Sequence, residues 1–345
     1  MSKEERKILI LTNGLTEQAD EGFLNVANQL IKRIKKMNPD VYIASYERKS
    51  DLADRYFVLN KLFLNPGFLS FLSQYSGILY LPFPSKTFSL AVRIILLSRF
   101  ARGKVNVLLV MRGRWNWISK KLLLLSGAYI SVLSREANDF YCSMLPENRV
   151  KYIKAGVDMK RFLPVGEEKK ILLKEKYGLD SNRPIVLHVG HLSAGRNIGE
   201  LLKIDLKYQV VLVLSSLTSD EQDMELKEQL KRRPNIIFME GYLSHIEEIY
   251  QMADIYFFPT VEKGHCIDVP LSCLEAASCN KPVITTKYGE MEQLVHREGF
   301  YLYDPMSKDI DLNELIKRVL KEQKKDIRKQ VLEYDWDEAV MALKN

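Results

Sequence analysis

Short apolar runs alternate with helical patterns along almost the whole chain, and this alternation constrains the fold more than any other feature of the sequence. Runs of this length, separated by helical stretches, are typical of parallel strands connected by helices. We expect strands near residues 7–12, 41–45, 77–81, 105–110, 128–133, 184–190, 209–214, 235–238, 255–258, 282–286 and 300–303. The pattern therefore predicts an α/β protein built on parallel sheets.

The length of 345 residues favours two such domains, each with its own core. Residues 157–170 include a proline and a glycine but no strong period, which indicates an interdomain joint. We expect two Rossmann-like domains facing each other across a cleft, and a C-terminal helix that returns to the first domain. The expected bounds are residues 1–162, 163–330 and 331–345.

Residues 254–286 contain a candidate ligand site. Apolar strands at Ile255–Phe258 and Val283–Thr286 flank a loop that leads into a helix beginning near Pro270. A helix N-terminus at the carboxyl end of a parallel strand binds anions through its free amides and positive dipole end. Glu275, about one and a half turns into the helix, can accept hydrogen bonds from ribose hydroxyls. The arrangement suggests a bound nucleotide diphosphate, with an ordinary capped core helix as the alternative.

The net charge of +7 conceals an asymmetry between the two halves. Residues 1–162 contain 26 Lys and Arg against 13 Asp and Glu, net +13, whereas the remainder has 25 against 31, net −6. A basic half indicates an anionic partner, such as nucleic acid, a phosphate-bearing substrate or an acidic lipid surface. Nucleic acid is the least favoured, because the sequence contains no nucleic-acid-binding module.

Composition also bears on location and on metals. No apolar run reaches the roughly 18–20 residues of a membrane span, and the charged start does not resemble a signal peptide. Four scattered cysteines indicate a reducing, cytoplasmic setting, with association to the inner membrane face as a possibility. Cys266, Cys273 and Cys279 beside His265 lack the close pairing of metal ligands, so we expect no metal site and no cofactor.

Two apolar segments of the basic half are surface candidates. Residues 63–72 are apolar around a Pro-Gly pair, and an ordinary core helix is the favoured interpretation. Residues 111–121 mix tryptophan with basic side chains, as membrane-interfacial segments do. The alternative for the second segment is that its tryptophans pack inward while its lysines face water.

Several blocks between residues 150 and 297 follow a recognisable order and spacing. They are Ile153–Phe162 (IKAGVDMKRF), Leu187–Ile198 (LHVGHLSAGRNI), Glu240–Leu243 followed by Ala253–Ile255, and Leu274–Ala276 followed by Lys281–Ile284. Together they resemble the motifs of glycosyltransferase family 4, the glycosyl transferases group 1, which have the GT-B fold. The first half resembles the family only in its layout.

The resemblance implies roles for individual residues. Arg196 stands where the family has a lysine that binds the donor diphosphate, and a guanidinium can bind phosphate bidentately. Glu275 matches the second glutamate of the family's Glu-x(7)-Glu motif, which accepts hydrogen bonds from the ribose. Tyr242 and Leu243 would lie beside the base. Gly190 would let the backbone approach the phosphates.

Two residues depart from the family pattern. Ile267 occupies the position of the first glutamate, and Asp268 lies one residue later, next to Val269 in the expected donor site. Asp268 either holds the hydroxyls of the donor sugar or is the N-cap of the following helix. His191 replaces a second phosphate-binding arginine, and Lys263 or Arg112 could compensate.

The first half offers fewer assignments. All five histidines lie beyond residue 180, so the histidine that many family members contribute from the first domain is absent. Gly14 or Gly22 could approach the phosphates from this side. The polar candidates for the acceptor side are Arg112, Arg114, Glu136 and Asp139.

The resemblance implies a retaining, metal-independent glycosyltransferase that uses a nucleotide-diphosphate sugar, with uridine favoured as the nucleoside. Arg196 and Asp268 would be the catalytic residues. The basic, partly aromatic first half suggests a lipid-linked or surface-glycan acceptor at an anionic membrane surface. The missing glutamate and histidine leave a non-catalytic GT-B subunit as an alternative, and a sugar-nucleotide epimerase as a more remote one.

Overall fold

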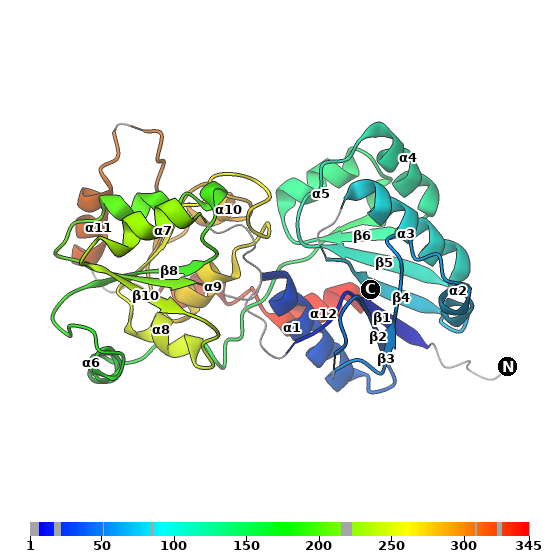
Figure 1. Ribbon diagram of the computed structural model, residues 1–345, viewed down its shortest axis with the longest axis horizontal. Helices are drawn as coiled ribbons and strands as arrows, with labels where there is room; N and C mark the ends of the chain where they lie inside the picture. The colour runs from blue at the N-terminus through cyan, green and yellow to red at the C-terminus, as the bar shows by residue number, and fades with distance from the viewer. Residues whose placement is uncertain are drawn as a thin grey trace. The chain divides into compact units, whose positions relative to one another are not determined.

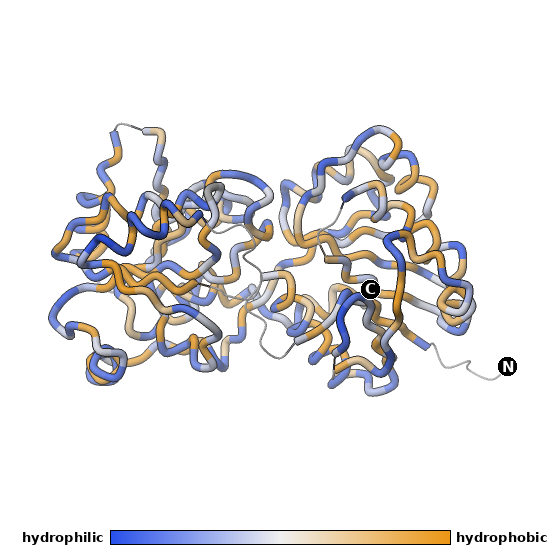
Figure 2. The backbone as a smooth tube through the Cα atoms, viewed as in Figure 1, coloured by the Kyte–Doolittle hydropathy of each residue, from blue (hydrophilic) through white to orange (hydrophobic). Residues whose placement is uncertain are grey.

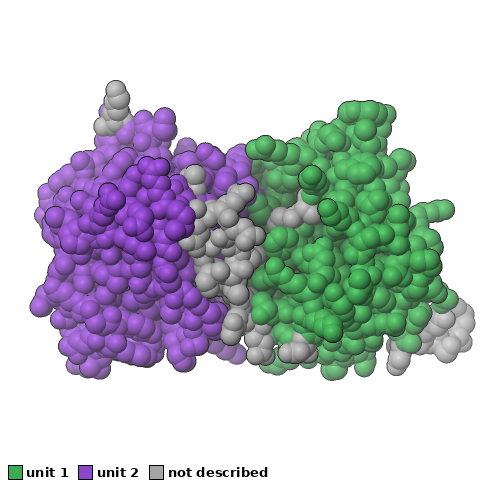
Figure 3. Space-filling view, viewed as in Figure 1, with its two compact units in different colours: residues 1–154, 336–345 green, residues 155–335 purple. Residues whose placement is uncertain are grey.

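The computed structural model describes residues 7–16, 22–50, 52–83, 86–214, 223–307, 309–322 and 326–344. The chain divides into two compact units, coloured separately in Figure 3. Unit 1 comprises residues 1–154 and 336–345, and unit 2 comprises residues 155–335. The division assigns residues 155–162 and 331–335 to unit 2.

Unit 1 contains a seven-stranded parallel sheet in the order β3-β2-β1-β4-β5-β6-β7 (Figure 1). Its strands are β1 Ile8–Thr12, β2 Tyr42–Tyr46, β3 Arg55–Phe57, β4 Gly77–Leu81, β5 Lys104–Leu109, β6 Tyr129–Val132 and β7 Val150–Tyr152. Its helices are α1 Gly22–Met37, α2 Pro66–Leu72, α3 Thr87–Phe100, α4 Trp117–Ser126, α5 Arg135–Cys142, η1 Glu147–Arg149 and α12 Trp336–Lys344.

Unit 2 contains a six-stranded parallel sheet in the order β10-β9-β8-β11-β12-β13. Its strands are β8 Ile185–Gly190, β9 Gln209–Leu214, β10 Ile236–Glu240, β11 Ile255–Phe258, β12 Val283–Thr285 and β13 Phe300–Leu302. Its helices are α6 Glu167–Lys176, α7 Met224–Lys231, α8 Ile246–Met252, α9 Leu271–Ser278, α10 Met291–Leu294, α11 Leu312–Lys321, η2 Ala194–Arg196, η3 Ile198–Lys203 and η4 Arg328–Val331.

The predicted α/β class and the parallel sheets are confirmed, and all eleven expected strands are present to within two residues at each end. The central strands were predictable because apolar residues fill both of their faces, as in β9, where all six residues are buried. Figure 2 shows the strands as largely hydrophobic segments, with hydrophilic stretches in many of the connecting loops. Strands β3 and β7 were not predicted, because each is a three-residue edge strand whose apolar run is broken by a charged residue, Arg55 or Lys151.

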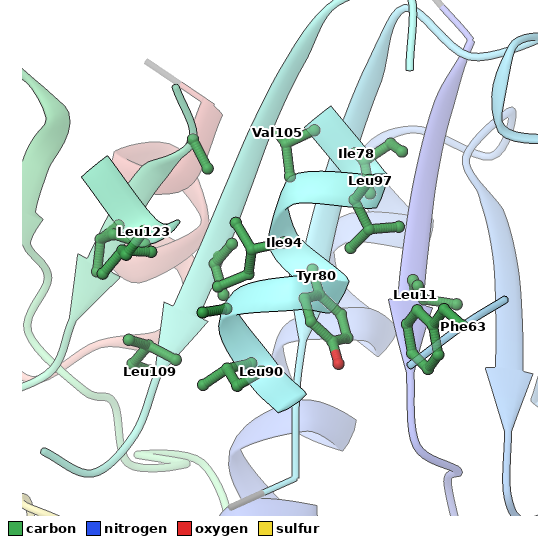
Figure 4. Packing of buried hydrophobic residues seen from close by; sticks show 14 of the residues in the cluster. Leu11, Phe63, Ile78, Tyr80, Leu90, Ile94, Leu97, Val105, Leu109 and Leu123 are labelled. Carbon is green, nitrogen blue, oxygen red and sulfur yellow. The ribbon is translucent and has the colours of Figure 1, made fainter. Parts of the chain in front are cut away.

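The core of unit 1 explains the apolar segment 63–72 (Figure 4). Phe63 packs edge-on against Tyr46 with ring centroids 4.8 Å apart, and Phe68 lies at 5.5 Å from Phe63. The buried Arg93 side chain donates from Nε to the Lys61 carbonyl at 2.8 Å and stacks over the Phe63 ring. The interpretation of this segment as part of the core is confirmed, because α2 buries its aromatic residues.

Helix α12 belongs to unit 1 although it follows the last residue of unit 2. It packs against α1, where Arg33 Nε lies 3.1 Å from the Asp337 carboxylate. Lys151 also donates to the Ala342 carbonyl at 2.7 Å. The chain thus returns to unit 1 at its C-terminal end, as the sequence predicts. Within the described residues, no helix combines the length and apolarity that a membrane span requires.

Candidate functional site

The residues expected to bind the donor lie at the carboxyl edge of the unit 2 sheet. Strand β8 has β9 on one side and β11 on the other, so the connections after β8 and β11 leave in opposite directions. Open α/β sheets bind ligands outside the carboxyl ends of the strands at such a switch point. The candidates are Gly190, His191 and Arg196 at or after β8, Tyr242 and Leu243 after β10, Lys263, Asp268 and Val269 after β11, and Glu275 on α9.

Arg196 is a buried cation at the end of β8. Its side chain is 9% exposed, and its Nε donates to the His265 carbonyl at 2.9 Å. One terminal nitrogen of the guanidinium occupies the space that a Cβ on Gly190 would need, which explains the glycine at this position. Among the described residues Arg196 forms no ion pair with a carboxylate. Because an unpaired buried cation is costly, this geometry favours an anionic ligand.

The loop after β11 holds this arginine in place. The His265 ring lies against Gly195, where no side chain would fit. The Glu262 amide donates to the Gly195 carbonyl at 3.4 Å, and His265 Nε2 lies 3.3 Å from the Glu262 carboxylate. The loops that follow β8 and β11 are therefore joined through backbone and side-chain contacts around Arg196.

His188 is a further polar group at this edge, to which the sequence analysis assigned no role. Its Nδ1 lies 2.8 Å from the Phe257 carbonyl, and its Nε2 has no hydrogen-bond partner among the described residues. Burial lowers the pKa of His188 to about 4, and the charge of Arg196 acts in the same direction. The ring is therefore neutral at physiological pH. Since a carbonyl only accepts, Nδ1 carries the proton and Nε2 remains an acceptor.

Glu275 lies on α9 in contact with Tyr250 of α8. The Tyr250 hydroxyl donates to Glu275 Oε2 at 2.7 Å, which leaves Oε1 available to a ligand. Burial raises the pKa of Glu275 to about 7, although Tyr250 and the nearby Arg161 oppose this rise. Arg161 itself is fixed by an ion pair with Glu247, with Nε 2.7 Å from the carboxylate. A partly buried carboxylate with one free oxygen is suited to accept hydrogen bonds from hydroxyl groups.

The interpretation of Asp268 as the N-cap of α9 is wrong. The N-cap residue is Pro270, whose own side chain makes no capping hydrogen bond. Asp268 lies before the cap in a segment fixed by its backbone, where its carbonyl accepts from the Glu290 amide at 2.9 Å. That carbonyl also occupies the space that a Cβ on Gly289 would need, at a backbone φ of +52°. The backbone around Asp268 is therefore held by the turn after β12, and the sugar-binding role of its side chain stays a prediction.

The remaining donor candidates differ in exposure. Tyr242 is 42% exposed and Lys263 is exposed, whereas Val269 is fully buried and could contact a ligand only through its backbone. Leu243 and His191 are half-buried. Within the described ranges, no group of three or more His, Cys, Asp or Glu side chains is placed to hold a metal ion.

The acceptor-side candidates lie at the carboxyl edge of the unit 1 sheet. Arg112 forms an ion pair with Glu136 at 2.9 Å and stacks over the Phe140 ring. Arg114 is exposed. The space over Gly14 is taken by Arg48, since a Cβ on Gly14 would lie 2.7 Å from the Arg48 Cβ. Gly14 is therefore accounted for by packing within unit 1. Gly22 is the first residue of α1.

Solved structures with the same fold cover nearly the whole chain. The crystal structure of Anabaena HepE in complex with UDP superimposes with a TM-score of 0.78 and 16% identity, covering 98% of each chain. The crystal structure of WaaG, a glycosyltransferase involved in lipopolysaccharide biosynthesis, superimposes with a TM-score of 0.60 and 13% identity, covering 96% of this chain and 94% of WaaG. At these identities the likeness establishes the fold.

Sequence relatives match about half of the chain or less. Alpha-maltose-1-phosphate synthase of Mycobacterium tuberculosis is 25% identical over 194 residues, 52% of this chain and 48% of the relative. Alpha-galactosylglucosyldiacylglycerol synthase of Streptococcus pneumoniae is 22% identical over 155 residues, 42% of this chain and 40% of the relative. The matched segments thus span about half of each relative's length or less. Residues 169–334 match the family described as glycosyl transferases group 1. Residues 169–334 are therefore similar to the glycosyl transferases group 1, and the chain has the GT-B fold.

Proposed function

We propose that this protein is a retaining glycosyltransferase that moves a sugar from a nucleotide-diphosphate sugar to an acceptor hydroxyl. The observation that carries the proposal is Arg196, a buried guanidinium without a carboxylate partner among the described residues, at the switch point of the unit 2 sheet. A diphosphate supplies the negative charge that this cation lacks, and bidentate contacts fit its geometry.

A uridine diphosphate sugar is the favoured donor. Glu275 presents a free carboxylate oxygen, suited to the ribose hydroxyls, on the helix that follows the switch-point strand β11. Structures of HepE have been solved with UDP and with UDP-glucose, and HepE shares the fold over nearly the entire chain. These observations support a nucleoside diphosphate in the same place.

Catalysis would depend on stabilising the leaving group. In this proposal Arg196 and the N-terminus of α9 stabilise the charge that develops on the departing diphosphate, in place of a metal ion or other cofactor. Asp268 would hold the hydroxyls of the donor sugar and so orient its anomeric carbon. The bond from that carbon to the diphosphate breaks while the acceptor oxygen bonds to the same face. The proton of the acceptor passes to an oxygen of the leaving diphosphate, so no side-chain base is needed.

We propose a lipid-linked or surface-glycan acceptor at an anionic membrane surface, contacted through α4. Trp117 and Leu125 of this helix are 67% and 77% exposed, and Lys120 and Lys121 are exposed between them. Apolar, aromatic and basic side chains on one exposed helix are suited to a membrane interface. Residues 111–121 contain two tryptophans, Trp115 and Trp117. Of these, Trp115 is buried, and its Nε1 donates to the Tyr141 hydroxyl at 2.8 Å. Among the relatives, a diacylglycerol glycolipid synthase and a lipopolysaccharide enzyme support this class of acceptor.

A screen of nucleotide sugars by thermal unfolding tests the donor assignment. A ligand at 100 times its Kd stabilises a protein by about 2.7 kcal/mol. We expect stabilisation by a UDP-sugar and by UDP, and little by uridine alone. A protein that no nucleoside diphosphate or nucleotide sugar stabilises would contradict the proposal.

A non-catalytic GT-B subunit that binds a partner transferase or glycan is the second candidate. It is favoured by Ile267, which is 6% exposed and occupies the position of the family's first glutamate. Turnover separates the two functions. The alternative predicts a folded protein that releases no nucleoside diphosphate from any nucleotide sugar.

A further inference from the structure

Unit 2 has a cavity at the edge of its sheet opposite the donor candidates. It is lined by the residues that directly precede β11 and β12, by the start of α6 and by the end of α11, and its volume is about 200 Å³. The donor candidates lie at or beyond the carboxyl ends of the strands, and none of them lines this cavity. We call it the Lys281 pocket, after the lysine that precedes β12.

Charged side chains of both signs line this pocket: Lys170 and Lys281 together with Glu167, Asp254 and Glu322. Lys170 and Lys174 both contact Asp254, whose second oxygen also accepts from the Ile185 amide at 2.8 Å. Burial alone would raise the pKa of Asp254, but Lys170 and these hydrogen bonds outweigh it and hold the pKa below its usual value. Asp254 is therefore ionised, and its acceptor positions are already occupied.

Lys281 also lines the pocket. Its side chain is 9% exposed, and it has neither an ion pair nor a side-chain hydrogen bond among the described residues. Burial lowers the pKa of Lys281 to about 8; the charge of Lys170 adds to the effect, and the charges of Asp254 and Glu167 oppose it. Two further carboxylates line the pocket, but both have other partners. Glu167 is exposed and lies 3.7 Å from Lys170, and Glu322 accepts from the Tyr301 hydroxyl.

The start of α6 adds donors to the same pocket. This helix has ten residues, and its N-cap is Gly166, which has no side chain to satisfy the first amides. Residues 164, 165 and 167 line the pocket. The amides of the first turn and the positive end of the helix dipole therefore lie at the pocket that Lys281 lines.

We propose that the Lys281 pocket binds a small oxyanion, a phosphate or carboxylate group, through the Lys281 ammonium and the first amides of α6. The cavity is smaller than the roughly 300–1,000 Å³ typical of sites for drug-sized ligands, which favours a free anion or a small metabolite. This site is additional to the proposed donor site and does not depend on glycosyl transfer. An anion bound in the Lys281 pocket stabilises the folded state of unit 2, and it lies at the sheet edge opposite the proposed donor site.

Calorimetric titration with inorganic phosphate and with malonate, against sodium chloride at equal ionic strength, tests the proposal. The full chain carrying Arg196→Ala is the background, so that phosphate binding at the donor edge is weakened. We expect Lys281→Met to weaken binding of the preferred anion at least about tenfold, the scale of a charge-assisted hydrogen bond. Lys207→Met, which removes an exposed lysine of the same unit paired with Asp205, should leave the Kd unchanged.

Lys281→Met should fold, because it removes a buried charge that has no partner among the described residues. Independently of any variant, NMR of labelled lysine should show the pKa of Lys281 rising from about 8 when the bound anion is added, since the anion favours the ammonium form. Binding of phosphate alone or malonate alone supports the site and identifies the group. Absence of binding by both anions, or binding that survives Lys281→Met, would overturn the proposal.

Discussion

The two units share a strand order but differ in what they place at the carboxyl edge of the sheet. In unit 2, Arg196 and Glu275 are largely removed from water, and each is fixed by a backbone carbonyl or a buried hydroxyl. In unit 1, the comparable candidate Arg112 is 37% exposed at its side chain and paired with Glu136. Similar topology therefore places buried, fixed polar groups at this edge in unit 2 and an exposed ion pair in unit 1. Buried charge that lacks an internal partner, rather than the fold, distinguishes the proposed donor site from the same edge of unit 1.

The largest expected effect tests the buried cation of unit 2. Arg196→Ala should weaken UDP binding at least about 100-fold, because it removes more than one charged hydrogen bond, each worth roughly 1.5–3 kcal/mol. Binding of uridine should change little. Calorimetric titration with both ligands measures the difference, and equal losses for UDP and uridine would exclude a diphosphate contact.

The exposed face of α4 in unit 1 should contribute to membrane binding and not to nucleotide binding. Replacing Trp117 and Leu125 together with alanine should weaken binding to anionic vesicles about tenfold or more, because each exposed apolar side chain contributes roughly 1.5–3 kcal/mol when buried in the interface. Vesicle flotation with anionic and neutral lipids provides the measurement. Unchanged UDP affinity of the double variant is the control. If the double variant still floats with anionic vesicles, α4 does not form the membrane-binding surface.

The raised pKa of Glu275 predicts a pH dependence of donor binding. Since the pKa is about 7, the carboxylate ionises between about pH 6 and pH 8, and affinity for UDP-glucose should rise over this range. Glu275→Gln should abolish the rise and weaken binding about tenfold at pH 8. UDP-glucose is the suitable probe because its diphosphate diester does not titrate in this range. An equally steep profile in the variant would assign the pH dependence to another group.

The same pKa gives a stability control for that variant. A carboxyl group whose pKa is raised by folding makes the protein less stable as pH rises from its usual value of 4.5 to about 7. Glu275→Gln should remove this decrease and so be more stable than the parent protein at pH 8, by roughly 2–3 kcal/mol. Denaturant unfolding at pH 5 and pH 8 measures it.

Tyr250→Phe should have a smaller effect that acts through Glu275. Without the hydroxyl that donates to Oε2, the pKa of Glu275 should rise further, because this hydrogen bond lowers it. Affinity for UDP-glucose at pH 7 should fall about three- to fivefold and recover at higher pH. A loss that is the same at every pH would indicate general damage to α8 and not a positioning role.

The smallest expected effect lies in unit 1. Arg112→Ala should leave UDP affinity within about twofold and stability within about 1 kcal/mol, because an exposed ion pair contributes little. Any effect should fall on the KM for the acceptor. Weakening of UDP binding comparable to that of Arg196→Ala would remove the contrast between the units.

The sequence predicted the central strands and the chain segments that carry the donor residues, because continuous apolar runs and ordered motif blocks are local signals. The contacts that build the site could not be predicted, since they join distant segments. Tyr250 reaches Glu275 across 25 residues, and His265 reaches Arg196 across 69. His188 had no local signal, because a histidine within an apolar strand is typical of an ordinary core residue. The sequence also could not show that Trp117 is exposed while Trp115 is buried, because this difference depends on tertiary packing.

Release of UDP from UDP-sugars by the purified protein, in parallel with Arg196→Ala, tests the central claim most directly. We expect measurable release with at least one UDP-sugar and an at least about 100-fold lower rate for the variant, the typical consequence of removing a donor that stabilises developing charge. A folded wild-type protein that binds UDP but releases none from any UDP-sugar, or a variant that turns over as fast as the wild type, would contradict the proposed glycosyl transfer.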